Sequence, residues 1–396
     1  GGHGLVEVDV LAGLQRQLAL REVQPDRRAD RHRVHLALLQ QLLEREEVAR
    51  DAILLRGGLG AAGRRSAIRG RSGPRPSDAV ETMELLNIPD AVRERIRQLG
   101  PEGDRWLERA PLLLTDVARR WGVELGYVVD SASPAIVVRG RRAERPVVVK
   151  LWADLSQHPI EERVLRAANG RGYPQLFEAD AERGALLLEA LGPAFDLPRA
   201  EASGTLLDIV TRTLGAAWSV PLSAAAEADA HPAVLLRWLI EDNPPPLDVP
   251  DCRPAIERAL QYAQHRLDDD RPERHVLLHG DPAPLRFRQV QAPRPGAESG
   301  YVLITPHGLR GEREYDLGVI IREGTRPLLQ AEDAVVLVRG WCARLAGVTG
   351  TDPEVIWQWG LLQRVAHGLA VVNGPTPLAG RIYLQTATAL IDRSRR

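Results

Sequence analysis

The sequence is short of cysteine, of long apolar runs and of surplus charge, and each shortage excludes a class of protein. Its two cysteines, Cys252 and Cys342, form neither a disulfide framework nor a CxxC-type zinc site, which fits a reducing, cytoplasmic location. No apolar run is long enough for a membrane span. The formal net charge of −1 argues against a nucleic-acid partner, because nucleic-acid-binding domains are strongly basic. With 396 residues, 44% of them apolar, the chain can instead bury the cores of two or three domains.

Lysine is the scarcest basic residue, because Lys150 is the only lysine among 52 basic side chains. It stands in the run PVVVKLW. Arginine serves a solvated surface as well as lysine does, but its planar fork does not replace a compact ammonium at every site. A lysine that ends an apolar strand, with carboxylates on the next helix, is how kinase-type folds hold nucleotide phosphates. The alternative is that Lys150 is a lysine retained by chance on an edge strand.

The chain divides into three parts. Residues 1–82 contain no Phe, Tyr, Trp, Met or Lys, and we predict a poorly ordered or non-native N-terminal extension. The only methionine, Met83, opens a good helix, so we expect the native protein to start there, with a regulatory arm as the alternative. Residues 83–192 are predicted to form an N-lobe with leading helices and a nucleotide-binding sheet. Residues 193–396 are predicted to form a helical C-lobe with catalytic-type loops and a substrate pocket.

The local patterns predict an α+β, two-lobed, protein-kinase-like fold. Apolar runs separated by turn signals predict five strands, and a helical pattern with an Asn-Gly C-cap interrupts them. The expected strands are 123–129, 135–139, 146–152, 174–180 and 184–191, and the expected helices are 84–121 and 159–170. After about residue 200 the pattern is mostly helical, apart from two short strand-loop units at 274–287 and 300–309.

Four sequence segments occur in the order that kinase-type folds use them, and the first is the strand that carries Lys150. Glu161, with Glu162 beside it, lies on the helix after Lys150, where a carboxylate can pair with the ammonium and aim it at phosphates. The alternative is two solvated glutamates at a helix N-terminus. The third segment is the strand-to-glycine turn 186–193. In the fourth, VLLHGD places Asp281 at a loop apex, where it can accept a hydroxyl proton, and Asp316 is expected to brace that loop or to serve as an ordinary N-cap.

From Met83 onward the chain resembles the aminoglycoside phosphotransferases of the streptomycin 6-kinase type, including the hydroxyurea-resistance kinases. The resemblance covers most of residues 83–396 and none of residues 1–82. It implies a kinase-like fold and transfer of the γ-phosphoryl group of ATP to a hydroxyl of a small cationic antibiotic. It also implies that Lys150 holds phosphates, Glu161 orients it and Asp281 is the base. The motifs that carry it are VVVKLW, EERVLRAANGRG, ALLLEALGP, LLHGD, GYVLITPHGL, EYDLGVIIRE and EVIWQWGLLQRVAHGLAVV.

Two metal positions depart from the pattern of the family. Where the family has a metal-binding Asn after His-Gly-Asp, this chain has Arg286. Where the family has Asp-Pro-Asp-Gly or Asp-Pro-Lys-Gly, with the first Asp as main magnesium ligand, it has Thr305-Pro306-His307-Gly308. Magnesium prefers hard oxygen ligands, usually including carboxylates, so we expect no metal ligands and doubtful Mg²⁺ binding. A guanidinium can still contact phosphates bidentately.

The remaining candidate residues concern the nucleotide and the acceptor. The residues expected around ATP are Ser131, Ser133, Lys150, Glu189, Leu191 and Arg286, with His279 supporting the loop. For a cationic acceptor, Glu241 and Asp242 are the first acidic candidates. Asp268 to Asp270, Asp352, Glu354 and the tryptophans 238, 357 and 359 are others, although solvated charges and core tryptophans are the commoner outcome. Histidines 231, 265 and 367 have no ligand spacing and are predicted to be structural or exposed.

Two classes of function remain open on these residues. The first is an ATP-dependent O-phosphotransferase acting on a streptomycin-like small molecule. The second is a catalytically inactive pseudokinase that binds nucleotide, small molecule or a partner, which Arg286 and Thr305 favour. A decaying gene product is a third reading. Whether the chain is an enzyme is thus left open, as is its oligomeric state.

Overall fold

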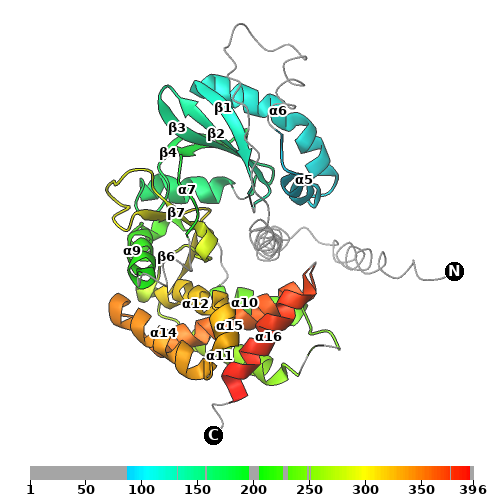
Figure 1. Cartoon of the computed structure of the whole chain (residues 1–396), viewed down its shortest axis with the longest axis vertical. Helices are drawn as coiled ribbons and strands as arrows, with labels where there is room; N and C mark the ends of the chain where they lie inside the picture. The colour runs from blue at the N-terminus through cyan, green and yellow to red at the C-terminus, as the bar shows by residue number, and fades with distance from the viewer. Residues whose placement is uncertain are drawn as a thin grey trace, which may run out of the picture.

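The computed structural model describes residues 87–131, 133–156, 158–195, 205–225, 231–247, 249, 251–374 and 376–392. The predictions for residues 1–82 lie outside these ranges. A five-stranded antiparallel sheet with three helices lies at one end of the molecule, and a larger group of helices lies at the other (Figure 1). We call the part from α5 to β5 the sheet lobe and the part from α9 to α16 the helical lobe.

The sheet lobe begins with a helical hairpin. Helix α5 (Asp90–Arg97) is followed by α6 (Pro101–Trp121), and Gly100, with φ of 75°, makes the turn between them. Proline at the first position of α6 is favourable because that N–H has no helical acceptor. The single helical stretch predicted over 84–121 is therefore two helices among the described residues, since Gly100 takes a conformation that ends α5.

The strands follow in a simple order. They are β1 (Val123–Val129), β2 (Ala135–Arg142), β3 (Arg145–Trp152), β4 (Leu176–Asp180) and β5 (Ala185–Glu189), with α7 (His158–Ala168) between β3 and β4. In space their order is β1-β2-β3-β5-β4, with every neighbouring pair antiparallel. The predicted strands are confirmed, and so is the two-lobed, protein-kinase-like fold class.

The two faces of β3 serve different purposes. Val147, Val149 and Leu151 are buried in one core with α5 and α6. Because side chains alternate along a strand, Val148 and Lys150 point to the opposite face. There Val148 packs against the second core, which α7 shares with the helical lobe. The alternation therefore delivers the only lysine to the side of the sheet that faces α7.

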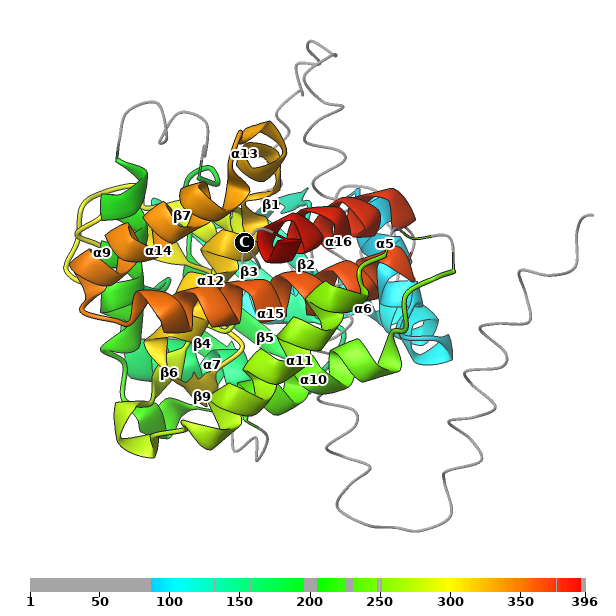
Figure 2. The ribbon, with the colours of Figure 1, turned by 90° about the horizontal axis from the view of Figure 1, so that it is seen from below.

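The helical lobe is built around one buried helix, α15 (Pro353–Val372), in which every residue from Val355 to Val372 is buried. Helices α16 and α11 lie on either side of it (Figure 2). It crosses α12 closely because Gly318 faces Gly360, and a Cβ on Gly318 would lie 2.9 Å from the Gly360 nitrogen. The remaining helices are α9 (Leu206–Trp218), α10 (Pro232–Asp242), α11 (Arg253–Asp268), α12 (Arg313–Glu323), α13 (Thr325–Gln330), α14 (Ala334–Thr349) and α16 (Pro377–Asp392).

Two antiparallel sheets of two strands each also belong to the helical lobe. Strand β6 (Val276–Leu278) pairs with β9 (Leu309–Gly311), and β7 (Phe287–Gln289) pairs with β8 (Tyr301–Leu303). Three short 3₁₀ turns, Leu222–Ala224, Pro272–Arg274 and Pro284–Arg286, complete the described structure. Among the helices it contains, none has the length and apolar character needed to cross a membrane.

Candidate active site

The single lysine forms a buried ion pair with the first glutamate of α7. Lys150 Nζ lies 2.9 Å from Glu161 Oε1 and 2.8 Å from Oε2, and the two side chains are 6% and 4% exposed. Strand β3 supplies the lysine and helix α7 the glutamate. The two residues that the sequence spacing suggested as partners are therefore in contact.

Trp152 completes this pair. Its Nε1 donates a 2.7 Å hydrogen bond to Glu161 Oε2, and Lys150 Nζ lies 4.0 Å from the centre of its ring. The tryptophan therefore holds the carboxylate and covers the ammonium with a π-face at the same time. Trp152 was not predicted as a site residue, although it stands in the quoted run PVVVKLW.

Lys150 also reaches the helical lobe. Its Nζ donates a 3.3 Å hydrogen bond to the hydroxyl of Thr305. Burial lowers the pKa of Lys150 from its ordinary value, the Glu161 carboxylate raises it, and the nearby Arg286 cation lowers it further. Since the charge of Arg286 acts on Lys150, the ammonium and the loop that carries Asp281 belong to one site.

Asp281 lies at the other side of this site and is held by cations. Its Oδ1 accepts a 2.6 Å hydrogen bond from Arg322 Nη2, and its Oδ2 lies 3.9 Å from Arg286 Nε. Arg322 lies on α12 and is 3% exposed, whereas Asp281 is 1% exposed. Nothing in the sequence singled out Arg322, because an arginine near the end of a helix, here beside Glu323, is usually solvated.

The loop before Asp281 is fixed by Asp316. The amides of His279 and Gly280 each donate a 2.9 Å hydrogen bond to its carboxylate, and Trp218 Nε1 donates a third of 2.9 Å. Burial is the larger influence and raises the pKa of Asp316 from 3.8 to about 6, while these three bonds lower it. Asp316 thus lies where the predicted brace would lie, within the first turn of α12 rather than at its N-cap.

His279 orients the same loop through its ring. Its Nδ1 accepts from the Asp281 amide at 3.1 Å, and its Nε2 lies 3.0 Å from the Ile304 carbonyl. Since a carbonyl only accepts, Nε2 carries the ring proton. Its own carbonyl accepts from the His307 amide at 2.8 Å, which joins the two strand-loop units.

The positions where the resemblance places magnesium do not suit that ion. Arg286 is a buried cation, and Thr305 offers a neutral hydroxyl that already accepts from Lys150. His307 is a buried imidazole whose ring stacks on His279 at 6.2 Å. Magnesium requires hard oxygen ligands at near-octahedral geometry, so this set does not fit it.

The residues expected around the nucleotide are partly engaged within the protein. Ser131 Oγ accepts from the Ser133 amide at 3.2 Å, which tightens the turn after β1. The Glu189 amide donates to the Gln175 carbonyl at 2.9 Å. The Leu191 carbonyl accepts from the Arg139 guanidinium. The Glu189 amide and the Leu191 carbonyl, in the segment expected to meet adenine, therefore already have partners within the protein.

The expected acceptor residues lie elsewhere on the helical lobe. Glu241 pairs with Arg237 at 2.7 Å and lines a shallow depression with Glu257, Leu260, Gln261 and Gln264. Asp242 is exposed at the end of α10. No residue that lines this depression belongs to the set around Lys150 and Asp281, so the structure does not bring the two predicted groups together.

The other acidic and aromatic candidates have structural partners. Asp352 caps α15 through the Glu354 amide, and Glu354 pairs with Arg339. Trp357 is buried beneath Arg339, and Trp359 Nε1 donates a 2.6 Å bond to Glu312. Asp268 and Asp269 bond Gln264 and Arg266 respectively. The residues of this site that sequence reasoning missed are Arg322, Trp152 and Trp218.

Comparison with known proteins finds relatives of one kind. The chain is 23% identical over 281 residues to a streptomycin 6-kinase of Streptomyces glaucescens, covering 69% of this chain and 87% of that protein. It is 26% identical over 360 residues to a hydroxyurea phosphotransferase of Kitasatospora aureofaciens, covering 84% and 93%. No protein-family model matches the chain.

Solved structures of similar fold include two kinases. A choline kinase from Streptococcus pneumoniae gives a TM-score of 0.49 at 12% identity, covering 70% of this chain and 99% of that one. A thermostable mutant of an aminoglycoside phosphotransferase, in complex with ADP and hygromycin B, gives a TM-score of 0.48 at 12% identity, covering 69% and 97%.

Proposed function

We propose that this chain, as a member of the aminoglycoside phosphotransferase family, binds ATP at Lys150. We further propose that it transfers phosphoryl groups slowly or not at all. The acceptor in this proposal is a hydroxyl of a small cationic molecule of the streptomycin class. The observation that carries nucleotide binding is the buried pair of Lys150 and Glu161. A compact ammonium fixed by a carboxylate is the group that kinase-type folds direct at phosphates.

Slow transfer is supported by the surroundings of Asp281. A general base must be able to take the proton of the attacking hydroxyl. Here the carboxylate already accepts from Arg322, with Arg286 on its second oxygen. Asp281 would have to leave Arg322 before it could serve as a base. Phosphoryl transfer also depends on cations that offset charge on the transferred group. Lys150, Arg286 and Arg322 are cations of this site, and we propose that Lys150 and Arg286 bind the phosphates.

The second candidate function is that of a pseudokinase, which binds nucleotide without transfer. The ion pair between Asp281 and Arg322 favours it, because it occupies the only catalytic carboxylate of the proposed mechanism. The two candidates share the nucleotide site and differ only in turnover.

Binding is tested by thermal unfolding of the whole chain with ATP, in the presence and absence of Mg²⁺. A ligand that binds only the folded state raises Tm with concentration. We expect ATP to raise Tm for the native chain and for Glu162→Gln, and to have no effect on Lys150→Met or Glu161→Gln. Glu162 is the matched control, because it lies beside Glu161 but pairs with Arg166 instead. No effect of ATP on the native chain would overturn the proposal.

Transfer is tested by ATP consumption with a streptomycin-type acceptor. We expect little turnover by the native chain. The double variant Thr305→Asp with Arg286→Asn supplies the carboxylate and the amide of the family pattern, and we expect it to raise turnover at least tenfold with Mg²⁺. If the double variant binds MgATP yet remains inactive, the pseudokinase function is favoured. If the native chain already turns over at the rate of the double variant, transfer is not suppressed and that part of the proposal is wrong.

A further inference from the structure

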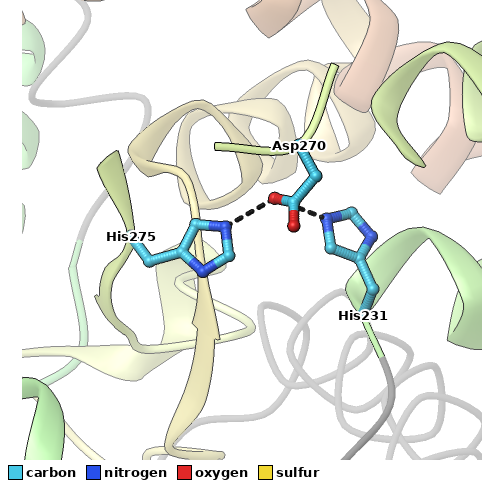
Figure 3. Close-up of side chains that lie close together, drawn as sticks. All are labelled: His231, Asp270 and His275. Atoms are coloured by element: carbon cyan, nitrogen blue, oxygen red, sulfur yellow. Dashed lines mark hydrogen bonds and ion pairs between the residues drawn. The ribbon is translucent and has the colours of Figure 1, made fainter. Parts of the chain in front are cut away.

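A second group of side chains with metal-ligand chemistry lies at the opposite end of β6 from Asp281. His231, Asp270 and His275 each offer one ligand atom, and these atoms lie within 4.8 Å of one another. Figure 3 shows the Asp270 carboxylate between the two imidazole rings. His231 is predicted from the sequence to be structural or exposed, because no ligand spacing surrounds it. In the structure it caps α10, and the residues beside it come from other elements.

Three elements meet at this group. His231 is the N-cap residue of α10, Asp270 follows the end of α11, and His275 directly precedes β6. His275 Nε2 lies 2.6 Å from Asp270 Oδ1, and His231 Nε2 lies 3.5 Å from the same oxygen. The side chains are 7%, 31% and 16% exposed for His275, Asp270 and His231. The group is therefore mostly buried but open to solvent at the carboxylate.

We propose that His231, Asp270 and His275 form a binding site for a divalent transition-metal ion of the Zn²⁺ type, with water as the fourth ligand. Two imidazole nitrogens and one carboxylate oxygen are ligands that zinc accepts, with bonds of about 2.0–2.2 Å. Tetrahedral bonds of this length place ligand atoms about 3.3 Å apart. Small movements of the rings, within the span of 4.8 Å, bring the three atoms to that spacing.

The hydrogen bonds of the His231 and His275 rings show which ring protons a bound ion would displace. His231 Nδ1 accepts from the Ala233 amide at 3.1 Å, so the ring proton is on Nε2, which faces Asp270. His275 Nδ1 is buried and has no hydrogen-bond partner among the described residues, so the ring is held there only through Nε2. Zinc binding moves both ring protons to Nδ1. The capping hydrogen bond from the Ala233 amide to His231 Nδ1 is then lost, and two metal–nitrogen bonds form.

The charges around the site allow a cation. A ligand imidazole must be neutral, and His231 Nδ1 carries no proton because it accepts from the Ala233 amide. The guanidinium of Arg266, on α11, is already paired with Asp269 at 2.8 Å and with Glu312 at 3.4 Å. The bound ion would tie the starts of α10 and β6 to the end of α11, and β6 leads directly to His279 and Asp281.

The test uses the whole chain after treatment with a chelator. We expect it to take up one Zn²⁺ in competition with a chromophoric chelator, and Tm to rise with zinc concentration. Asp270→Asn and His275→Gln should weaken binding at least 100-fold. The matched controls are Asp269→Asn, the neighbouring carboxylate, and His265→Gln, a histidine of α11 beside Tyr262. They should change the affinity less than threefold.

Cobalt provides a readout that does not depend on the folding of a variant. We expect Co²⁺ bound to the native chain to show the intense visible bands of a tetrahedral site, and Zn²⁺ to abolish them. Absence of those bands, or equal zinc affinity in His275→Gln and His265→Gln, would show that the group is only a hydrogen-bonded cluster. Since no ATP is present, the outcome is independent of the nucleotide proposal.

Discussion

The carboxylate of Asp281 and the guanidinium of Arg322 form a buried ion pair, with 2.6 Å between Oδ1 and Nη2. They lie 41 positions apart in the sequence, one at a loop apex and the other on α12. The pair fills the place where an attacking hydroxyl would approach in the proposed mechanism. The free energy of coupling between Asp281 and Arg322 therefore measures how strongly the protein favours this arrangement of the site.

Removing only one partner of this pair should be costly. Arg322→Met leaves the buried Asp281 carboxylate without this guanidinium, and breaking a buried pair costs about 3–5 kcal/mol. The double variant Arg322→Met with Asp281→Leu should recover most of that loss, because it removes both members of the pair together. Urea unfolding of the four proteins measures the coupling between the two residues.

The matched control for that cycle is Arg310→Met, an exposed arginine on β9. It should change the free energy of unfolding by less than about 0.5 kcal/mol. A double variant as unstable as the sum of the two single variants would mean that the pair contributes no coupling, and that the distance overstates its role.

Lys150 offers a labelling experiment that few proteins allow. As the only lysine, it is the only side chain that an amine-reactive acyl phosphate of adenosine can acylate at an ε-amine. Burial lowers its pKa, which increases the fraction of reactive neutral amine. We expect one labelled site by mass spectrometry, blocked by excess ATP, and none in Lys150→Arg. Labelling that ATP leaves unchanged would separate the reactivity of the lysine from nucleotide binding.

Local patterns predicted the sheet and the pairing of Lys150 with Glu161, because both depend on short-range periodicity. The strand alternation sends Lys150 toward α7, and the first turn of α7 carries Glu161. Contacts that depend on tertiary packing could not be predicted from such local patterns. Arg322 is an arginine near the end of a helix, which is usually solvated, and nothing in its neighbours indicates that it meets Asp281.

The same limit applies to the histidines and the acidic residues. His231 and His275 come together only because α10 and β6 begin side by side, so their spacing in the sequence carried no signal. Glu241 illustrates the same limit, since a charged residue on a helix has the same sequence pattern in a substrate pocket and on a solvated face. Its partner Arg237, one turn earlier, indicates the solvated face.

Thr305 should be strained, and a pair of variants can show it. Its φ of 56° lies in the left-handed region, where β-branched residues are outliers and asparagine is tolerated. Thr305→Asn keeps a side-chain oxygen for Lys150 and should stabilise the protein by about 1 kcal/mol. Thr305→Val keeps the branched shape but loses the hydroxyl, and should destabilise it by about 1 kcal/mol. Urea midpoints that move in the same direction for both variants would contradict this account.

Asp316 should make the protein more stable at low pH than at neutral pH, which is the opposite of the usual effect of a carboxyl group. Its pKa is raised from 3.8 to about 6 in the folded protein because burial outweighs the bonds from His279, Gly280 and Trp218. Protonation therefore favours folding. The contribution of Asp316 is fully present below about pH 4 and is lost as the pH rises through 6.

The measurement is the difference in unfolding free energy between the native chain and Asp316→Asn at pH 4.5 and pH 7. Because one pKa unit corresponds to about 1.4 kcal/mol, the native chain should gain about 2 kcal/mol over the variant at the lower pH. Asp116→Asn is the control of opposite sign, since Arg119 lowers the pKa of Asp116 below 3.8. The native chain should lose stability relative to that variant only as the pH falls below about 4, so their difference should stay nearly constant between pH 7 and pH 4.5. Should Asp316→Asn not fold, carbon-13 NMR of the native carboxyl group follows the same proton. A titration midpoint near 3 or below would mean that the three hydrogen bonds outweigh burial, and that Asp316 braces the loop as a carboxylate at every pH at which the protein is folded.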